Sequence, residues 1–97
     1  MNYTLRHVHY TDQQLADLIY DPIVRRARLL GGGFGASQRA LREAGASFGL
    51  IAAMAGVCKR TVQFRCIEDV ARPSWHAQLV ADAREALAAV FPGEVSA

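Results

Sequence analysis

The sequence predicts an all-α fold, a small bundle of about five to six helices. The chain has 97 residues, which suits a single domain, and 52% of them are hydrophobic. Much of that apolar half is alanine, the residue with the highest helix propensity. Capping residues precede several apolar segments of helical spacing, and Gly or Pro residues follow them. Only the first ten residues look strand-like, and we expect an arm or short extended segment there.

The first 36 residues are expected to hold N-terminal helices and a Gly-rich connector. Thr11 and Gln14 form a capping-box pattern that begins a helix. Asp21-Pro22 is expected to end that helix and to open another, with Asp as N-cap and Pro at the first helical position. The glycines of residues 31–35 should end this second helix.

Residues 37–70 are expected to form a unit of three short helices. Ser37 is predicted to cap the first helix and Ser47 the second. Gly56 suits the turn after the second helix, where a left-handed backbone conformation disfavours other residues. The third helix should run from about 58 to 70.

The third helix has one face that fits a core and one that does not. Val62, Cys66 and Val70 share a stripe at helical spacing, which predicts that they are buried. The opposite face then carries Lys59, Arg60, Thr61, Gln63, Phe64 and Arg65.

A last helix is expected over residues 74–91, after Pro73 and with Ser74 as its cap. Its apolar face is expected either to pack on the domain's own core or to form a dimer interface. That face contains Trp75, Leu79, Ala83, Leu87 and Val90, with Val80 and Phe91 beside it.

Charge is unevenly distributed along the chain. Residues 25–65 hold eight Lys and Arg against one Glu, a net charge of +7, whereas the two flanks are mildly acidic and the whole chain is +2. A basic block between acidic flanks favours a polyanionic partner over a merely solvated surface.

Residues 41–65, LREAGASFGLIAAMAGVCKRTVQFR, resemble a helix-turn-helix DNA-binding unit. They are similar to the three-helix, homeodomain-like form found in serine invertases, resolvases and small bacterial or phage regulators. The small Ala52, Gly56 four residues later and Val62 six residues after that carry the resemblance. It implies that the helix from Cys58 enters the major groove of double-stranded DNA. Cys58 departs from the pattern, because Ser or Thr is commoner there.

The resemblance also implies roles for individual side chains. Lys59 or Arg60 would read guanine and Gln63 adenine. Phe64 would touch a thymine methyl group, or else lie in the core. Further backbone or phosphate contacts are expected from Arg42, Ser47, Thr61 and Arg65.

A second basic group precedes this unit. Arg25, Arg26 and Arg28 would lie in the minor groove if their segment were an extended arm. A helix with a solvated basic face is the preferred alternative, because Pro22 and the apolar residues after it fit an amphipathic helix. Arg39 is grouped with them as a further phosphate contact.

Other chemistry finds little support in the sequence. The glycines of residues 31–36 fit a dinucleotide fingerprint on paper but lack the strand and βαβ unit that it needs. His7, His9 and His76 do not form a recognisable metal site, and we expect no cofactor, no metal and no enzymatic activity. Cys58 and Cys66 lie too far apart along one helix for a disulfide, and an inert Cys58 thiol is preferred to a redox sensor.

We therefore expect one all-helical domain spanning residues 1–97 that binds double-stranded DNA sequence-specifically. The preferred role is transcriptional regulation, repressor-like, by a cytoplasmic, nucleoid-associated homodimer that reads half-sites about 34 Å apart. The alternatives are an accessory factor for recombination or plasmid maintenance and an antitoxin-type adaptor with a protein partner. No apolar segment is long enough to span a membrane.

Overall fold

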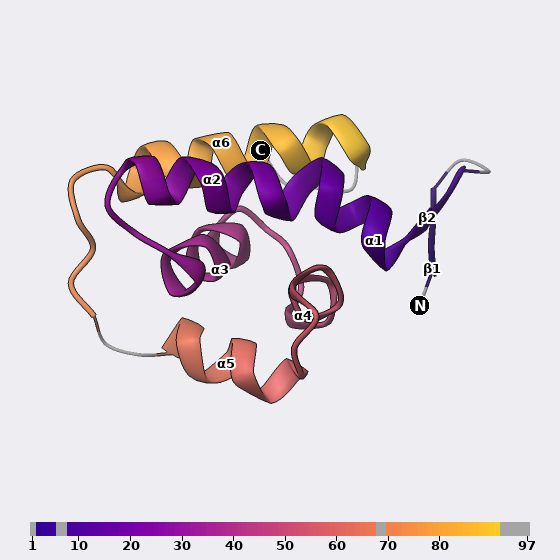
Figure 1. Cartoon of the computed structure of the whole chain (residues 1–97), viewed down its shortest axis with the longest axis horizontal. Coiled ribbons are helices and arrows are strands. Elements are labelled where there is room, and N and C mark those ends of the chain that lie inside the picture. The colour runs from indigo at the N-terminus through magenta and orange to yellow at the C-terminus, as the bar shows by residue number, and fades with distance from the viewer. Residues whose placement is uncertain (1, 6–7, 68–69, 92–97) are drawn as a thin grey trace.

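The computed structural model describes residues 2–5, 8–67 and 70–91. It confirms the predicted all-α class, a small helical bundle to which a short N-terminal hairpin is attached. One long helical segment and the C-terminal helix lie side by side, and three shorter helices pack beneath them (Figure 1). The hairpin projects from one end of the bundle.

The predicted extended segment is a two-stranded antiparallel hairpin. Strand β1 (Asn2–Leu5) pairs with β2 (Val8–Thr11) in a register that sets Tyr3 opposite Tyr10. The Tyr10 ring meets the Phe91 ring edge-on, with 6.2 Å between the centroids. This contact joins the base of the hairpin to the end of the C-terminal helix.

The chain stays helical from Asp12 to Leu29, through α1 (Asp12–Leu15), the π-helix η1 (Ala16–Tyr20) and α2 (Asp21–Leu29). The Thr11 capping box is confirmed, because the Thr11 hydroxyl accepts from Gln14 N–H and the Gln14 side chain accepts from Thr11 N–H. The predicted break at Asp21-Pro22 is wrong.

The π-helix explains why Pro22 does not end the helix. Asp21 N–H donates to the carbonyl of Ala16, five residues back. In a regular α-helix the proline ring would clash with the carbonyl four residues earlier, and the wider turn accommodates it.

Helix α3 (Phe34–Glu43) begins three residues before the predicted cap, so that prediction is wrong. Gly33 stands at the N-cap, and Ser37 is fully buried with its hydroxyl donating to the Gly33 carbonyl at 2.7 Å. A Ser side chain that bonds back to its own helix does not cap it. Gly35 lies inside the first turn of α3, although a non-helical connector was expected over the glycines of residues 31–35.

Helices α4 (Phe48–Ala55) and α5 (Lys59–Ile67) follow the prediction closely at their shared turn. The Ser47 hydroxyl accepts from Leu50 N–H at 3.1 Å, which confirms the cap. Gly56 has φ of 69°, in the left-handed region, as expected.

The predicted extension of the third helix to residue 70 is wrong. Helix α5 ends at Ile67, and Val70 lies in the following linker, where 45% of its surface is exposed. Its carbonyl accepts a hydrogen bond from the Arg72 side chain at 2.7 Å, so Val70 belongs to the linker and not to the core stripe.

Helix α6 (His76–Val90) completes the bundle. Ser74 does not cap it: Trp75 occupies the N-cap position, and His76 N–H donates to the Pro73 carbonyl. The apolar face of α6 predicted from the sequence packs against α3, η1 and α2. Of the two alternatives for this face, packing on the domain's own core is therefore the one that the structure has. Of the described helices, none combines the length and apolar character needed to cross a bilayer. Leu15, Ile19, Leu41, Ile51, Leu79 and Leu87 are the largest fully buried apolar side chains.

The turn between α4 and α5 gives a first testable prediction. Gly56→Ala should lower the free energy of unfolding by roughly 1–2 kcal/mol, because a Cβ is disfavoured at positive φ. Gly49→Ala is the matched control: its Cβ meets nothing within 4 Å, and alanine favours helix, so unfolding should cost about 0.5–1 kcal/mol more. Urea titration measures both. Equal effects from the two variants would contradict the strained turn.

Candidate nucleic-acid interface

Helix α5 lies at the edge of the bundle, on the side away from α2 and α6 (Figure 1). It packs against α3 and α4. Within Lys59–Ile67, Val62 is the one fully buried residue, at 0% exposure. Val62 and the half-buried Cys66 pack the helix against the core, and Lys59, Arg60, Phe64 and Ile67 remain exposed.

The exposed face of α5 brings together most of the predicted reading residues. Arg60, Gln63, Phe64 and Ile67 line one shallow hollow on this face. Lys59 is exposed beside it. The spacing i, i+3, i+4 and i+7 explains why these side chains share a face. We refer to these five residues as the α5 face.

The α5 face carries positive charge without local compensation. Residues 48–67 contain Lys59, Arg60 and Arg65 and no Asp or Glu. Among the described residues no carboxylate pairs with Lys59 or Arg60. The Arg60 guanidinium lies 6.0 Å from the centroid of the Phe64 ring.

Two apolar side chains stand out on the α5 face. Phe64 is 58% exposed, so the alternative that placed it in the core is wrong. Ile67 is 71% exposed and was missed in the sequence, although its position three residues after Phe64 is the signal that would have found it. Burying such groups against a partner is favourable, which marks this face for contact.

Thr61 and Cys58 lie at the start of α5. The Cys58 sulfur and the Thr61 hydroxyl oxygen are 3.1 Å apart, and the Cys58 carbonyl accepts from Thr61 N–H. The hydrogen bonds from Thr61 lower the pKa of the Cys58 thiol. Burial raises the pKa of Cys66, whose Sγ lies 3.7 Å from the Gln38 carbonyl. Both are free thiols.

The two cysteines should therefore react at different rates. Because the thiolate is the nucleophile, the lowered pKa and the exposure of Cys58 predict faster alkylation than for Cys66 at neutral pH. The pH midpoint of alkylation should also be lower for Cys58. Iodoacetamide kinetics on Cys58→Ser and Cys66→Ser variants, read by mass spectrometry, measure each thiol alone. Faster reaction of Cys66 would contradict the arrangement.

Arg42 and Ser47 lie where α3 leads into α4. Arg42 Nη1 donates to the Ala46 carbonyl at 3.2 Å, and its guanidinium lies 4.2 Å from the centroid of the Phe48 ring. Ser47 uses its hydroxyl oxygen as an acceptor in the α4 cap, which leaves its O–H available to a phosphate. Both residues are exposed.

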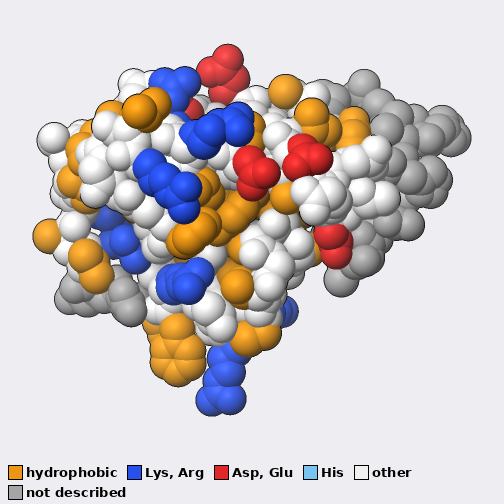
Figure 2. All heavy atoms as spheres, in the orientation of Figure 1, with side chains coloured by type: hydrophobic (Ala, Val, Ile, Leu, Met, Phe, Trp, Pro, Cys, Tyr) orange, Lys and Arg blue, Asp and Glu red, His pale blue; other side chains and the backbone are white. Residues whose placement is uncertain are grey.

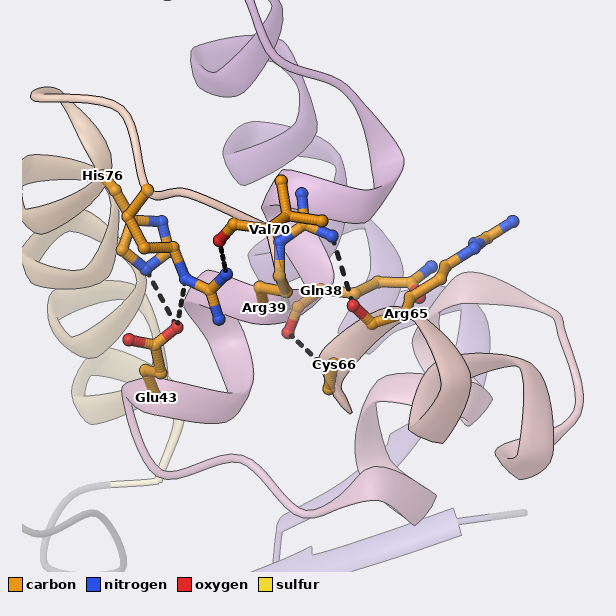
Figure 3. Close-up of polar contacts among 8 residues, drawn as sticks. Gln38, Arg39, Glu43, Arg65, Cys66, Val70 and His76 are labelled. Atoms are coloured by element: carbon orange, nitrogen blue, oxygen red, sulfur yellow. Dashed lines mark hydrogen bonds and ion pairs between the residues drawn. The ribbon is translucent and has the colours of Figure 1, made fainter. Parts of the chain in front are cut away.

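Arg39 and Arg65 lie closer to the core than the other predicted contacts. Arg39 Nη1 donates to the Arg65 carbonyl at 3.1 Å, so a guanidinium of α3 serves the C-terminal end of α5 (Figure 3). Arg39 and Arg65 are both half-buried.

The charge of Arg65 also acts on Tyr20. Burial raises the pKa of Tyr20, and its hydrogen bond with Gln38 and the charge of Arg65 oppose that rise.

Arg25, Arg26 and Arg28 lie on α2, in regular helix and not on an extended arm. Arg26 is 3.6 Å from an oxygen of Asp82 on α6, and the Arg28 guanidinium lies 5.1 Å from the centroid of the Phe34 ring. On the face of the molecule drawn in Figure 2, Lys and Arg side chains lie over the region from the end of α2 down to α5. Asp and Glu lie mostly towards the hairpin end.

Comparison with known proteins leaves the site to be judged on its own geometry. No family model, no curated protein and no solved structure matches the chain. Within the described residues no three His, Cys, Asp or Glu side chains converge as metal ligands. His76 is instead bonded to Glu43 at 2.9 Å, and the side chains of His7 and His9 lie outside the described part.

Proposed function

We propose that this protein binds double-stranded DNA sequence-specifically, with the α5 face in the major groove. The observation that carries the proposal is the exposed, uncompensated pair Lys59 and Arg60, with the half-buried Gln63 on the same face, on the second helix of a tight two-helix unit. Guanidinium and ammonium groups favour guanine O6 and N7, and a Gln amide favours adenine N6 and N7. Arg42 and Ser47, at the entry to α4, would position the protein on phosphates.

The biological role that fits this chemistry best is transcriptional regulation, as a repressor-like bacterial or phage protein acting in the cytoplasm. An accessory factor for recombination or plasmid maintenance would use the same contacts, and measurable bending of its DNA would favour that role. Neither role needs a cofactor or a catalytic group.

A homodimer belongs to the proposal, because one such helix reads only a few base pairs. The surface that joins two copies is not the apolar face of α6. Leu79, Ala83 and Leu87 on that face are 0% exposed within the single chain. A dimer must therefore use the outer surface of the bundle or the N-terminal hairpin.

The proposal is tested by selecting bound sequences from random duplex DNA and then titrating the enriched duplex by fluorescence anisotropy. We expect one enriched motif and an affinity that falls steeply with salt, since each neutralised phosphate adds about 0.9 to the slope of log K against log salt. Palindromy in the motif would indicate a dimer. Failure to enrich any sequence at low salt, or binding without salt dependence, would refute it.

A second candidate function, a protein adaptor, is favoured by the apolar part of the same surface. Phe64 and Ile67 on the α5 face are 58% and 71% exposed, and a protein partner would bury both. Phe64→Ala with Ile67→Ala separates the two functions. DNA binding should weaken only a fewfold, because Arg60 and Gln63 remain, whereas binding of a protein partner should be lost.

A further inference from the structure

One feature that DNA binding does not use is a cleft of about 380 Å³ between the Gly-rich turn and the linker before α6. Gly31, Gly33 and Gly35 form one wall. Arg72, Trp75 and His76 form much of the other. Its volume falls in the range of small-molecule sites. The cleft is separate from the hollow on the α5 face, with which it shares no lining residue.

The side chains that line this cleft carry positive charge. Arg39 and Arg72 both line it, and none of the described residues that line it is acidic. The nearby Glu43 binds Arg72 Nε at 3.4 Å and His76 Nε2 at 2.9 Å from outside the cleft (Figure 3). Arg72 Nη1 donates to the Val70 carbonyl, while Nη2 has no hydrogen bond to a described residue. Arg72 is thus held in place and still offers donors.

His76 supplies a second polar group. The residue is 7% exposed, lines the cleft and is oriented by its Nε2 contact with Glu43. Its other ring nitrogen, Nδ1, has no hydrogen-bond partner among the described residues. A ring nitrogen at the wall of the cleft that no described protein group occupies is available to hydrogen-bond a ligand there.

The backbone completes the arrangement. Helix α3 starts at this wall with Gly33 as its N-cap and without a capping side chain, so the first N–H groups of the helix lack the partner that most helices have. Such N–H groups and the helix dipole favour an anion. Gly35 leaves room for Arg39, because a Cβ there would lie 3.2 Å from Arg39 Nη1.

The geometry points to a binding site in this cleft for a small organic anion that carries a phosphate or carboxylate group. The anionic group binds at the α3 N-terminus and Arg72, with His76 Nδ1 as a further contact. The indole of Trp75 gives the rest of the ligand an apolar surface; it packs so closely on Gly32 that a Cβ there would lie 2.6 Å from the ring.

Trp75 is the single tryptophan of the chain, so its fluorescence reports directly on the cleft. The full chain is titrated with glycerol phosphate and with inorganic phosphate at constant ionic strength, balanced with chloride. We expect a saturable change in Trp75 emission. The absence of a saturable change with both probes would overturn the proposal.

Gly33→Asp is the decisive variant. Asp is a favoured N-cap and the backbone at Gly33, with φ of −161°, is extended, so the helix should be as stable or more so. Its carboxylate occupies the same N–H groups and repels the ligand, which should weaken binding at least about tenfold. Unchanged affinity would refute the site.

Two further variants complete the design. Lys59→Gln, which also lowers the net charge by one but lies on the α5 face, should bind as the native chain does. Arg72→Gln should weaken binding even if Gly33→Asp fails to fold. If a DNA duplex alters Trp75 emission while glycerol phosphate does not, the cleft holds a DNA phosphate and the small-anion site is wrong.

Discussion

Replacing Arg60 by glutamate should weaken DNA binding by at least about a hundredfold. Loss of one base-reading arginine alone costs roughly 1–3 kcal/mol, and a carboxylate in its place adds repulsion from the phosphates. Arg60 is exposed and has no described carboxylate partner, so thermal stability should hardly change. Anisotropy titrations with the selected duplex measure the loss, and thermal unfolding checks the fold.

The control must separate a specific contact from a change in overall charge. Ala77→Glu with Ala88→Glu also lowers the net charge by two, but both positions are exposed on α6, away from the α5 face. This double variant should bind within a fewfold of the native chain at physiological salt, because charges more than about 8 Å away are screened. If both variants lost affinity equally, the α5 face would not be the interface.

Arg60→Ala and Gln63→Ala sharpen the same prediction. Each should relax the preference at one base pair, since each removes a base-edge contact. Arg42→Ala should instead weaken binding to all sequences alike, because a phosphate contact carries no sequence information.

Local signals in the sequence predicted the features of the fold that depend on a few neighbouring residues. The Thr11 capping box, the Ser47 cap and the Gly56 turn are each set by one side chain or by the lack of one, and the structure has all three. The helix starts predicted at Ser37 and Ser74 were wrong, because Gly33 and Trp75 stand at the N-cap positions instead. Ser37 is buried among other helices, where its hydroxyl bonds back to the Gly33 carbonyl.

The unbroken helix across Pro22 was beyond prediction for a related reason. Proline normally ends a helix, and only the π-helix before it removes the conflict. Nothing in residues 16–20 signals that wider turn. It is stabilised by tertiary packing, with Leu15, Ile19 and Tyr20 all buried.

The candidate interface was predictable where periodicity alone decides which residues are exposed. Val62 is buried, and Lys59, Arg60 and Phe64 are exposed, as a single helical stripe requires. Arg39 differs because its partner, the Arg65 carbonyl, is 26 residues away in the chain. Long-range pairing of this kind, and the cleft beside it, appear only when the helices are assembled.

Leu87→Ala should have the largest effect on stability, lowering the free energy of unfolding by about 2–5 kcal/mol. Leu87 is fully buried on α6 and packs in the core between α6 and the helices beneath it. The truncation leaves a cavity in a chain whose total stability is of the order of 5–15 kcal/mol. The midpoint of thermal unfolding should fall by at least about 10 °C for a domain of this size.

Leu29→Ala is the matched control, since it makes the same chemical change at a leucine that is 84% exposed. It should change the free energy of unfolding by no more than about 0.5 kcal/mol. The comparison also tests where α6 is buried. If Leu87 packs within one chain, the difference in unfolding free energy between the variant and the native chain is independent of protein concentration, whereas at a dimer interface this difference changes with concentration. A concentration-dependent loss for Leu87→Ala would contradict the packing of α6 on its own bundle.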